Sequence, residues 1–126
     1  WRIGVLGGKA LFACRYHMAR GHWQIVATGS TGRRRYGRVE AVPLEQAPAE
    51  AIEIATRATR LIGDGLYGVD IKESKGEFVV IEINDNPNVD AGCEDAATGP
   101  LLYTTVMDWF RHKLDLRGPN GDPSFE

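Results

Sequence analysis

Three oxygen-bearing side chains in residues 68–88 have the types and spacing to bind a divalent cation. Asp70 lies in a first strand-like run, and Glu82 and Asn84 lie in a second, beyond a short polar turn. Two carboxylates and one amide oxygen are hard ligands, which suit Mg²⁺ or Mn²⁺ better than zinc or copper. Mg²⁺ usually takes further ligands from substrate phosphates, so this set predicts a phosphate-bearing partner. The alternative is that Asp70 and Glu82 only form a solvated polar face of a sheet.

The two runs are expected to pair as an antiparallel hairpin. Strand alternation places Glu82 and Asn84 on one face of the second run. Directly opposed residues share a face, so Asp70 and Glu82 meet only if the connecting loop has an odd number of residues. A three-residue loop, residues 75–77, satisfies this condition, and its central Gly76 can take a positive φ. The other face of the second run would carry the apolar Val79, Ile81 and Ile83.

Two arginines could bind the anion that this cluster implies. Arg2 and Arg15 lie near the outer ends of a second predicted hairpin, with strands at residues 2–6 and 10–16. Its Gly7-Gly8 dipeptide suits a type I′ turn. The planar donors of two guanidinium groups fit phosphate oxygens, so both could reach one anion. The alternative is that both arginines are solvated.

A basic stretch at residues 19–37 is rich in Gly, Ser, Thr and Arg and is expected to be a mobile loop. Its Arg33, Arg34 and Arg35 are either solvated, close over an anionic ligand, or contact nucleic acid. One short basic patch in an acidic chain gives little support for nucleic acid. We therefore do not expect nucleic acid as a partner.

The other elements are expected to support the two hairpins. Residues 38–42 read as a short strand or an extended link, and residues 48–62 as an amphipathic helix. A last helix begins near residues 98–100, and its apolar stripe consists of Leu102, Val106, Trp109, Phe110 and Leu114. Residues 63–68 match GxGxxG, but they follow a helix and open a strand, the reverse of a dinucleotide-binding motif. The acidic stretch after Asn84 lacks the Gly and Glu spacing of an EF-hand.

Composition describes an ordinary globular domain. The 126 residues are 43% hydrophobic and 25% charged, with a net charge of −2. No apolar run approaches the roughly 20 residues that span a bilayer, so we expect no membrane partner. Without a signal peptide, we expect a cytoplasmic protein in which Cys14 and Cys93 are free thiols. The chain begins at Trp1 without an initiator methionine, which suggests a piece of a larger protein.

The order of these elements resembles the C-terminal half of the ATP-grasp ligases. The resemblance is greatest to the RimK-like group, which adds glutamate to ribosomal proteins or related targets. Its specific part is Gly68-Val69-Asp70, followed by Glu82-Ile83-Asn84. The resemblance implies an α+β fold, an antiparallel sheet with helices packed on one face. It covers residues 1–114 as a C-terminal subdomain, and residues 115–126 are expected to be a flexible tail.

The resemblance also implies a reaction, in which ATP phosphorylates a carboxylate and an amine attacks the acyl phosphate. Asp70, Glu82 and Asn84 would bind two Mg²⁺ or Mn²⁺ ions, with Glu82 bridging them. Arg2 and Arg15 would contact the phosphates of ATP or the acyl phosphate. The substrates would be a carboxylate and an amine, with a protein or peptide tail among the candidates. The half that binds the nucleotide would lie upstream, so the isolated chain is expected to be inactive.

The sequence departs from the family after Asn84. Family members often continue with a small residue, Pro and Gly, whereas this chain has Asp85-Asn86-Pro87-Asn88, which leaves the substrate end of the site undefined. The Asp that the family carries before its first strand Arg is absent. A noncatalytic metal- or nucleotide-binding module of the same fold remains an alternative. The sequence does not identify the substrates, and it leaves open whether the protein forms an oligomer.

Overall fold

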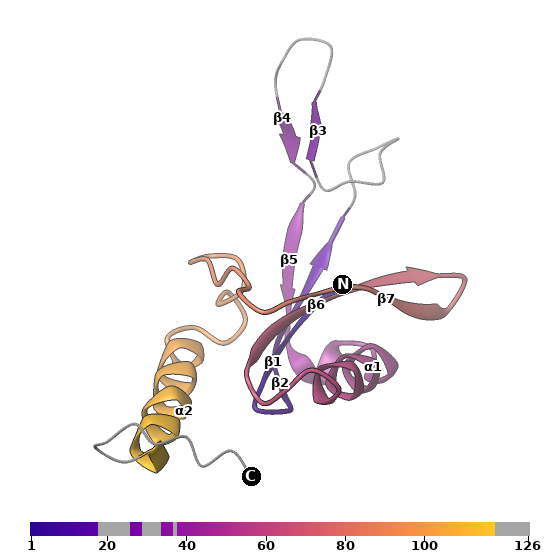
Figure 1. Cartoon of the computed structure of the whole chain (residues 1–126). Helices are drawn as coiled ribbons and strands as arrows, with labels where there is room; N and C mark the ends of the chain where they lie inside the picture. The colour runs from indigo at the N-terminus through magenta and orange to yellow at the C-terminus, as the bar shows by residue number, and fades with distance from the viewer. Residues whose placement is uncertain (18–25, 29–33, 37, 118–126) are drawn as a thin grey trace.

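A five-stranded antiparallel sheet forms the centre of the chain (Figure 1). The computed structural model describes residues 1–17, 26–28, 34–36 and 38–117. The sheet has the order β5-β2-β1-β6-β7, and each neighbouring pair is antiparallel. The α+β class and the antiparallel sheet are therefore confirmed. The strands are β1 (Arg2–Leu6), β2 (Lys9–Tyr16), β5 (Val39–Val42), β6 (Leu66–Ser74) and β7 (Glu77–Asn84).

Glycines shape the β1–β2 hairpin at its turn and in its middle. Gly7 and Gly8 connect the strands with φ of 56° and 77°, which confirms the expected type I′ turn. Gly4 lies opposite Phe12, and a Cβ at Gly4 would lie only 2.3 Å from a carbon of the Phe12 ring. The Phe12 ring therefore lies flat over the backbone of β1, which only glycine permits.

Helix α1 (Ala49–Arg60) covers one face of the sheet, after the short 3₁₀ helix η1 (Leu44–Gln46). Its buried residues Ala51, Ala55 and Thr59 recur every four positions, so one narrow, small-residue stripe faces the strands. The expected end at residue 62 is too late, and Leu61 is 89% exposed beyond the helix. The buried core on this side consists of Ile3, Val5, Ala13, Ala47, Ala51, Ala55, Val69 and Ile71.

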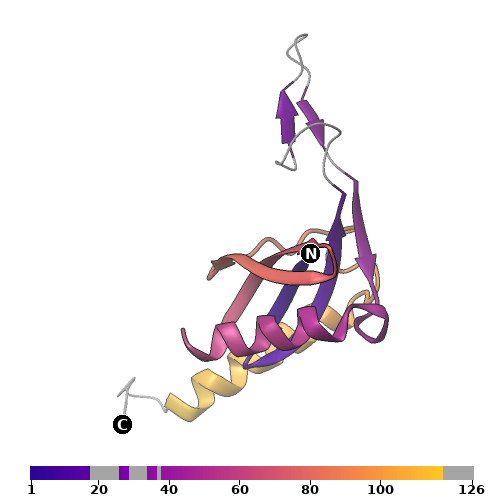
Figure 2. The ribbon, with the colours of Figure 1, turned by 90° about the vertical axis from the view of Figure 1, so that its right-hand side faces the viewer.

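Helix α2 (Leu101–Arg117) begins against the opposite face of the sheet. Its Leu102 is buried with Phe12 and Cys14, whose side chains alternate with the α1-facing residues of β2. The two helices therefore do not share one face, contrary to the expected arrangement, as the side view in Figure 2 shows. The reason is that both faces of β2 carry apolar side chains that need cover.

Most of α2 projects away from the sheet. Phe110 and Leu114 are 42% and 65% exposed, so the predicted apolar stripe is buried only at its N-terminal end. The helix continues through residues 115–117, which the sequence assigned to the tail, and residues 118–126 lie outside the described part. Neither α1 nor α2 is long and apolar enough to cross a membrane.

The basic stretch contains two short strands. β3 (Val26–Thr28) and β4 (Arg34–Tyr36) pair antiparallel as a separate two-stranded sheet. Arg34 and Arg35 therefore belong to a strand, which corrects part of the expected loop. Arg33 and most of the remaining stretch lie outside the described residues. Both cysteines are free thiols, as expected.

Candidate functional site

The β6–β7 hairpin places Asp70 directly opposite Glu82, as the sequence predicts. Its loop is shorter than expected. Ser74 pairs with Glu77, which leaves Lys75-Gly76 as a two-residue turn with φ of 54° and 80°. Positive φ at both central residues is typical of the type I′ turn, whose twist matches that of antiparallel strands. The predicted three-residue loop is therefore wrong.

A β-bulge at Ile81 restores the pairing that the shorter loop would otherwise lose. In a regular ladder from this turn, Asp70 would lie opposite Ile81. Instead the register shifts between Asp70 and Ile71, and Ile71 pairs with Val80. The additional residue resets the alternation, so Val80 and Ile83 both pack against the core, while Ile81 is 66% exposed. The structure thus corrects the expected apolar face, which consisted of Val79, Ile81 and Ile83.

Arg2 joins the two carboxylates in a row across three strands, which we call the Arg2–Asp70–Glu82 row. Arg2 of β1 lies opposite Asp70 of β6, which in turn lies opposite Glu82 of β7. Nε of Arg2 donates to Oδ1 of Asp70 at 2.7 Å, and Nη2 donates to Oδ2 at 2.9 Å. The side chains of Arg2 and Asp70 are only 16% and 29% exposed. The hydrogen bond to Asp70 raises the pKa of Arg2 above its ordinary value.

Glu82 and Asn84 lie at the outer strand of the sheet. Glu82 is exposed, so its carboxylate is open to a ligand. Asn84 lies opposite Gly68, two positions beyond Glu82 in the ladder, and its Oδ1 accepts a hydrogen bond from the N–H of Asn86 at 2.8 Å. The structure therefore brings Asp70 and Glu82 together and places Asn84 farther along the same strand.

The chemistry of these donors fits a divalent cation that also binds phosphate. Both oxygens of Asp70 accept hydrogen bonds from Arg2, but a carboxylate oxygen keeps a further lone pair. Within the described part of the chain, no three His, Cys, Asp or Glu side chains gather as a metal-binding group. Asp70, Glu82 and Asn84 would therefore supply only part of a coordination sphere. Such sharing with water and phosphate is typical of Mg²⁺.

Arg15 lies apart from Arg2. The residue of β2 opposite Arg2 is Cys14, so alternation directs the neighbouring Arg15 to the other face. Its guanidinium lies over the ring of Trp1, with Cζ 5.6 Å from the ring centroid. Arg15 and Trp1 line a cleft of about 350 Å³ that Lys72 also borders. The structure thus does not bring the two arginines together.

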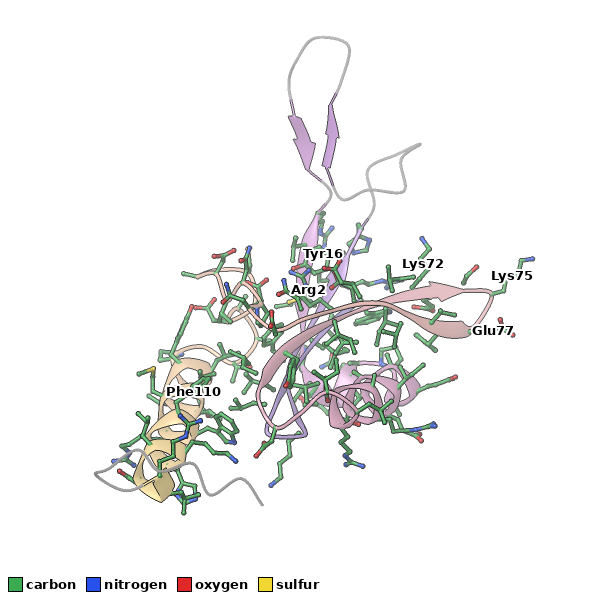
Figure 3. The ribbon with its side chains drawn as sticks, viewed as in Figure 1. Arg2, Tyr16, Lys72, Lys75, Glu77 and Phe110 are labelled. Carbon is green, nitrogen blue, oxygen red and sulfur yellow. The ribbon has the colours of Figure 1, made fainter. Side chains whose placement is uncertain are left out.

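Two residues beside the row were not expected from the sequence. The ring of Tyr16 lies against Arg2, with Cζ of Arg2 5.3 Å from the ring centroid (Figure 3). The Tyr16 hydroxyl donates to Oε1 of Glu94 at 3.1 Å, and Glu94 is only 3% exposed. Burial raises the pKa of Tyr16 above its ordinary value, although the charge of Arg2 opposes the shift. Alternation along β2 could have identified Tyr16, whereas a single Glu in an irregular segment gives no such signal.

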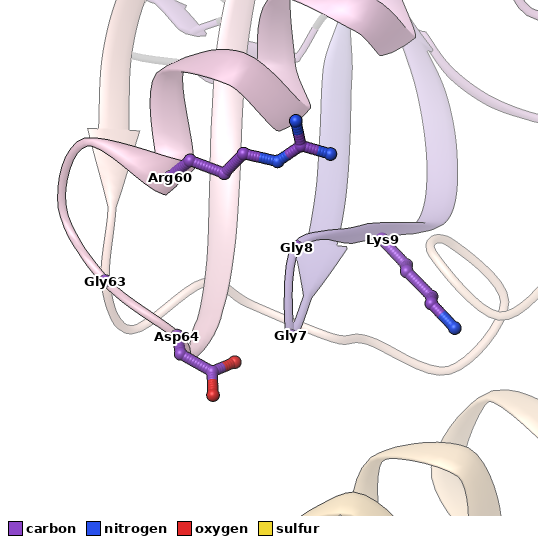
Figure 4. A pocket seen from close by; sticks show the side chains of 6 residues that line it. All are labelled: Gly7, Gly8, Lys9, Arg60, Gly63 and Asp64. Atoms are coloured by element: carbon purple, nitrogen blue, oxygen red, sulfur yellow. The ribbon is translucent and has the colours of Figure 1, made fainter.

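A second cleft lies at the other end of β1, beside the Gly7-Gly8 turn. It has a volume of about 530 Å³ and includes the start of the GxGxxG match (Figure 4). Residues 63–65 follow α1 and lead into β6, which confirms the context that excludes a dinucleotide-binding motif. The residues that line this cleft are Gly7, Gly8, Lys9, Arg60, Gly63 and Asp64.

Comparison with solved structures identifies the fold. The chain is similar to the ATP-grasp ligase PsnB, in a structure of its complex with a minimal precursor, with a TM-score of 0.58. The match covers 89% of this chain and 35% of that chain, at 20% sequence identity. No protein-family model matches the sequence, and no curated protein matches it. The chain therefore has the fold of part of an ATP-grasp ligase and spans about a third of the length of PsnB.

Proposed function

We propose that the full-length protein is an ATP- and Mg²⁺-dependent carboxylate–amine ligase of the RimK-like group. This chain would be the C-terminal portion of its ATP-grasp domain, and an upstream half would bind the nucleotide. The observation that carries the proposal is the Arg2–Asp70–Glu82 row on one face of the sheet. The similarity of fold to PsnB supports it. A row of two carboxylates and one guanidinium suits a ligand made of metal ions and phosphate.

In this proposal Asp70, Glu82 and Asn84 bind two Mg²⁺ or Mn²⁺ ions. When bound, such ions offset negative charge on the phosphoryl group that is transferred. The substrate carboxylate attacks the γ-phosphorus of ATP, which yields an acyl phosphate and ADP. The amine then attacks the acyl carbon, and phosphate leaves as the amide bond forms. The carboxylate and amine could include an amino acid and a protein or peptide tail.

The arginines would orient and neutralise the phosphates. Arg2 is held against Asp70 by two hydrogen bonds, so its charge already offsets one of the two carboxylates. That neutralisation lowers the repulsion that a polyanion such as ATP meets at this face. Arg15 lies on the other face of the sheet, so it would contact only a phosphate that enters the cleft it shares with Trp1 and Lys72. Positioning and charge neutralisation of this kind contribute most of the catalysis in phosphoryl transfer.

The substitution Glu82→Ala in the full-length protein tests this proposal. Substrate-dependent ADP formation should fall by about a hundredfold or more, because a ligand to the metal ions that offset the charge of the transferred phosphoryl group is lost. Circular dichroism should show an unchanged fold, since Glu82 is exposed. Glu77→Ala, at the exposed start of the same strand, is the matched control and should keep full activity. Retention of ADP formation by the Glu82 variant would refute the proposal.

A noncatalytic metal- or nucleotide-binding module of the same fold is the second candidate. The bidentate Arg2–Asp70 pair favours it, because such a pair is also an ordinary structural feature of a sheet. The two candidates differ in ATP consumption by the full-length wild-type protein with a panel of amino acids and acidic peptides. Consumption supports the ligase. If the protein binds nucleotide but consumes no ATP with any member of the panel, the result supports the noncatalytic module.

A further inference from the structure

We infer that Glu94 is a positioning residue that orients Arg2 through the ring of Tyr16. Its effect on turnover rests on the proposed function, whereas its effect on the orientation of Arg2 does not. Glu94 lies in the irregular segment between β7 and α2, and none of the roles proposed above uses it. It is nevertheless 3% exposed, the only buried charged side chain among the described residues.

Both carboxylate oxygens of Glu94 are fixed. Oε1 accepts from the hydroxyl of Tyr16 at 3.1 Å, and Oε2 accepts from the backbone N–H of Asp90 at 2.7 Å. Removing a carboxylate from water is costly, and these hydrogen bonds offset the cost only in this geometry. Glu94 therefore connects the segment after β7 to the end of β2 in one defined orientation.

Tyr16 passes this constraint to Arg2. A tyrosine side chain rotates about two bonds. Anchoring the hydroxyl restricts the rotation about Cα–Cβ, and packing against the cluster of Phe12, Cys14 and Leu102 restricts the rotation of the ring about Cβ–Cγ. The ring then presents its face to the Arg2 guanidinium, 5.3 Å from the ring centroid, while Asp70 holds the same guanidinium through two hydrogen bonds. Arg2 is thus held from two directions, and Figure 3 shows Tyr16 and Arg2 side by side. Without Glu94, the Tyr16 hydroxyl loses its anchor, and only packing against Phe12, Cys14 and Leu102 holds the ring beside Arg2.

The test uses two readouts in the full-length protein. The first is the ¹H–¹⁵N signal of the Arg2 Nε group, assigned by its loss in Arg2→Lys. The second is the kcat and KM of ATP turnover. Glu94→Ala and Tyr16→Phe should both shift or broaden the Arg2 signal. Both should also lower kcat about tenfold with a smaller change in KM, because a misplaced guanidinium stabilises the transition state less well.

Glu94→Gln is the rescue variant. Its amide oxygen can accept from the Asp90 N–H, and its amide nitrogen can donate to the Tyr16 oxygen. The Arg2 signal and kcat should therefore stay close to those of the wild type. Tyr103→Phe is the matched control. The Tyr103 hydroxyl donates to Asp95 at 2.9 Å in an exposed contact that involves none of Glu94, Tyr16 and Arg2. It should change neither readout.

The outcomes separate the positioning role from the proposed function. An unchanged Arg2 signal in both Glu94→Ala and Tyr16→Phe would overturn the inference. Glu94→Gln as impaired as Glu94→Ala would also overturn it, because charge rather than hydrogen bonding would then be responsible. Tyr16→Phe keeps the ring and its packing, so it decides the question even if Glu94→Ala does not fold. Absence of ATP turnover in the wild type would reject the ligase, and the Arg2 signal would still test the positioning role.

Discussion

The two faces of the central sheet are built from the same strands but have different properties. Ile3 and Val69 are fully buried beneath α1, while their sequence neighbours Arg2 and Asp70 point to the other face and pair with each other. The apolar face is packed against α1. On the other face, polar groups stay partly open to water near Glu82. Alternation therefore links the two faces in β1 and β6, because the register that buries Ile3 and Val69 also presents Arg2 and Asp70 on the other face.

Packing on the apolar face explains how the strands that carry the candidate site keep their register. A slip of one residue in β6 would expose Val69 and bury Asp70, so packing against α1 strongly disfavours it. The same packing fixes the register of β1 through Ile3, which places Arg2 beside Asp70. The site therefore depends on the core for its geometry.

The largest expected effect is on the packed face. Ile3→Ala in the full-length protein should lower the free energy of unfolding by about 2–5 kcal/mol, because Ile3 is fully buried and a cavity remains. Ile81→Ala is the matched control on β7, where the side chain is 66% exposed, and should change it by about 0.5 kcal/mol or less. Urea unfolding measures both. Equal losses for the two variants would contradict the described burial.

A smaller change in the free energy of unfolding, which depends on pH, should come from the buried Cys14 on the same face as Arg2. Burial raises the pKa of Cys14 to about 12, with the charge of Glu94 adding to the shift. The folded thiol holds its proton more tightly than the unfolded thiol. This contribution to stability is complete below the ordinary thiol pKa, and is lost as the pH rises from there toward about 12.

The substitution Cys14→Ala should remove this dependence. In the wild type, one such thiol lowers the free energy of unfolding by up to about 1.4 kcal/mol for each pH unit in that window. The variant should lose less stability per pH unit, and urea unfolding at a series of alkaline pH values measures the difference. Cys93→Ala, at a half-exposed position, is the control. The same slope in Cys14→Ala and the wild type would show that the thiol is not buried as described.

Local rules predicted the parts of the fold that depend on neighbouring residues. The Gly7-Gly8 turn, the antiparallel strands and the opposition of Asp70 and Glu82 all follow from turn chemistry and alternation. The reason given for the opposition was nevertheless wrong. The odd residue lies in a bulge at Ile81 and not in the loop, because the turn favours two residues and the core requires Val80 and Ile83 on one face.

The contacts between distant segments could not be predicted in this way. Glu94 reaches Tyr16 across 78 positions of the sequence, and its irregular segment has no period that indicates a buried residue. Arg15 was grouped with Arg2 because both lie near the outer ends of the β1–β2 hairpin, but a shift in the register of that hairpin places Cys14 opposite Arg2. In both cases the decisive information is the pairing of strands and the path of a loop, which local spacing does not determine.

The most direct test of the polar face measures Mn²⁺ binding to the full-length protein in the presence of a non-hydrolysable ATP analogue. The electron paramagnetic resonance signal of free Mn²⁺ reports how much of the ion is bound. Glu82→Gln should weaken Mn²⁺ binding by about tenfold or more, because a charged ligand becomes a neutral one. Glu77→Gln, in the same strand, should bind as the wild type does. Equal affinity of the wild type and Glu82→Gln would contradict the assignment of the Arg2–Asp70–Glu82 row as the metal and phosphate site.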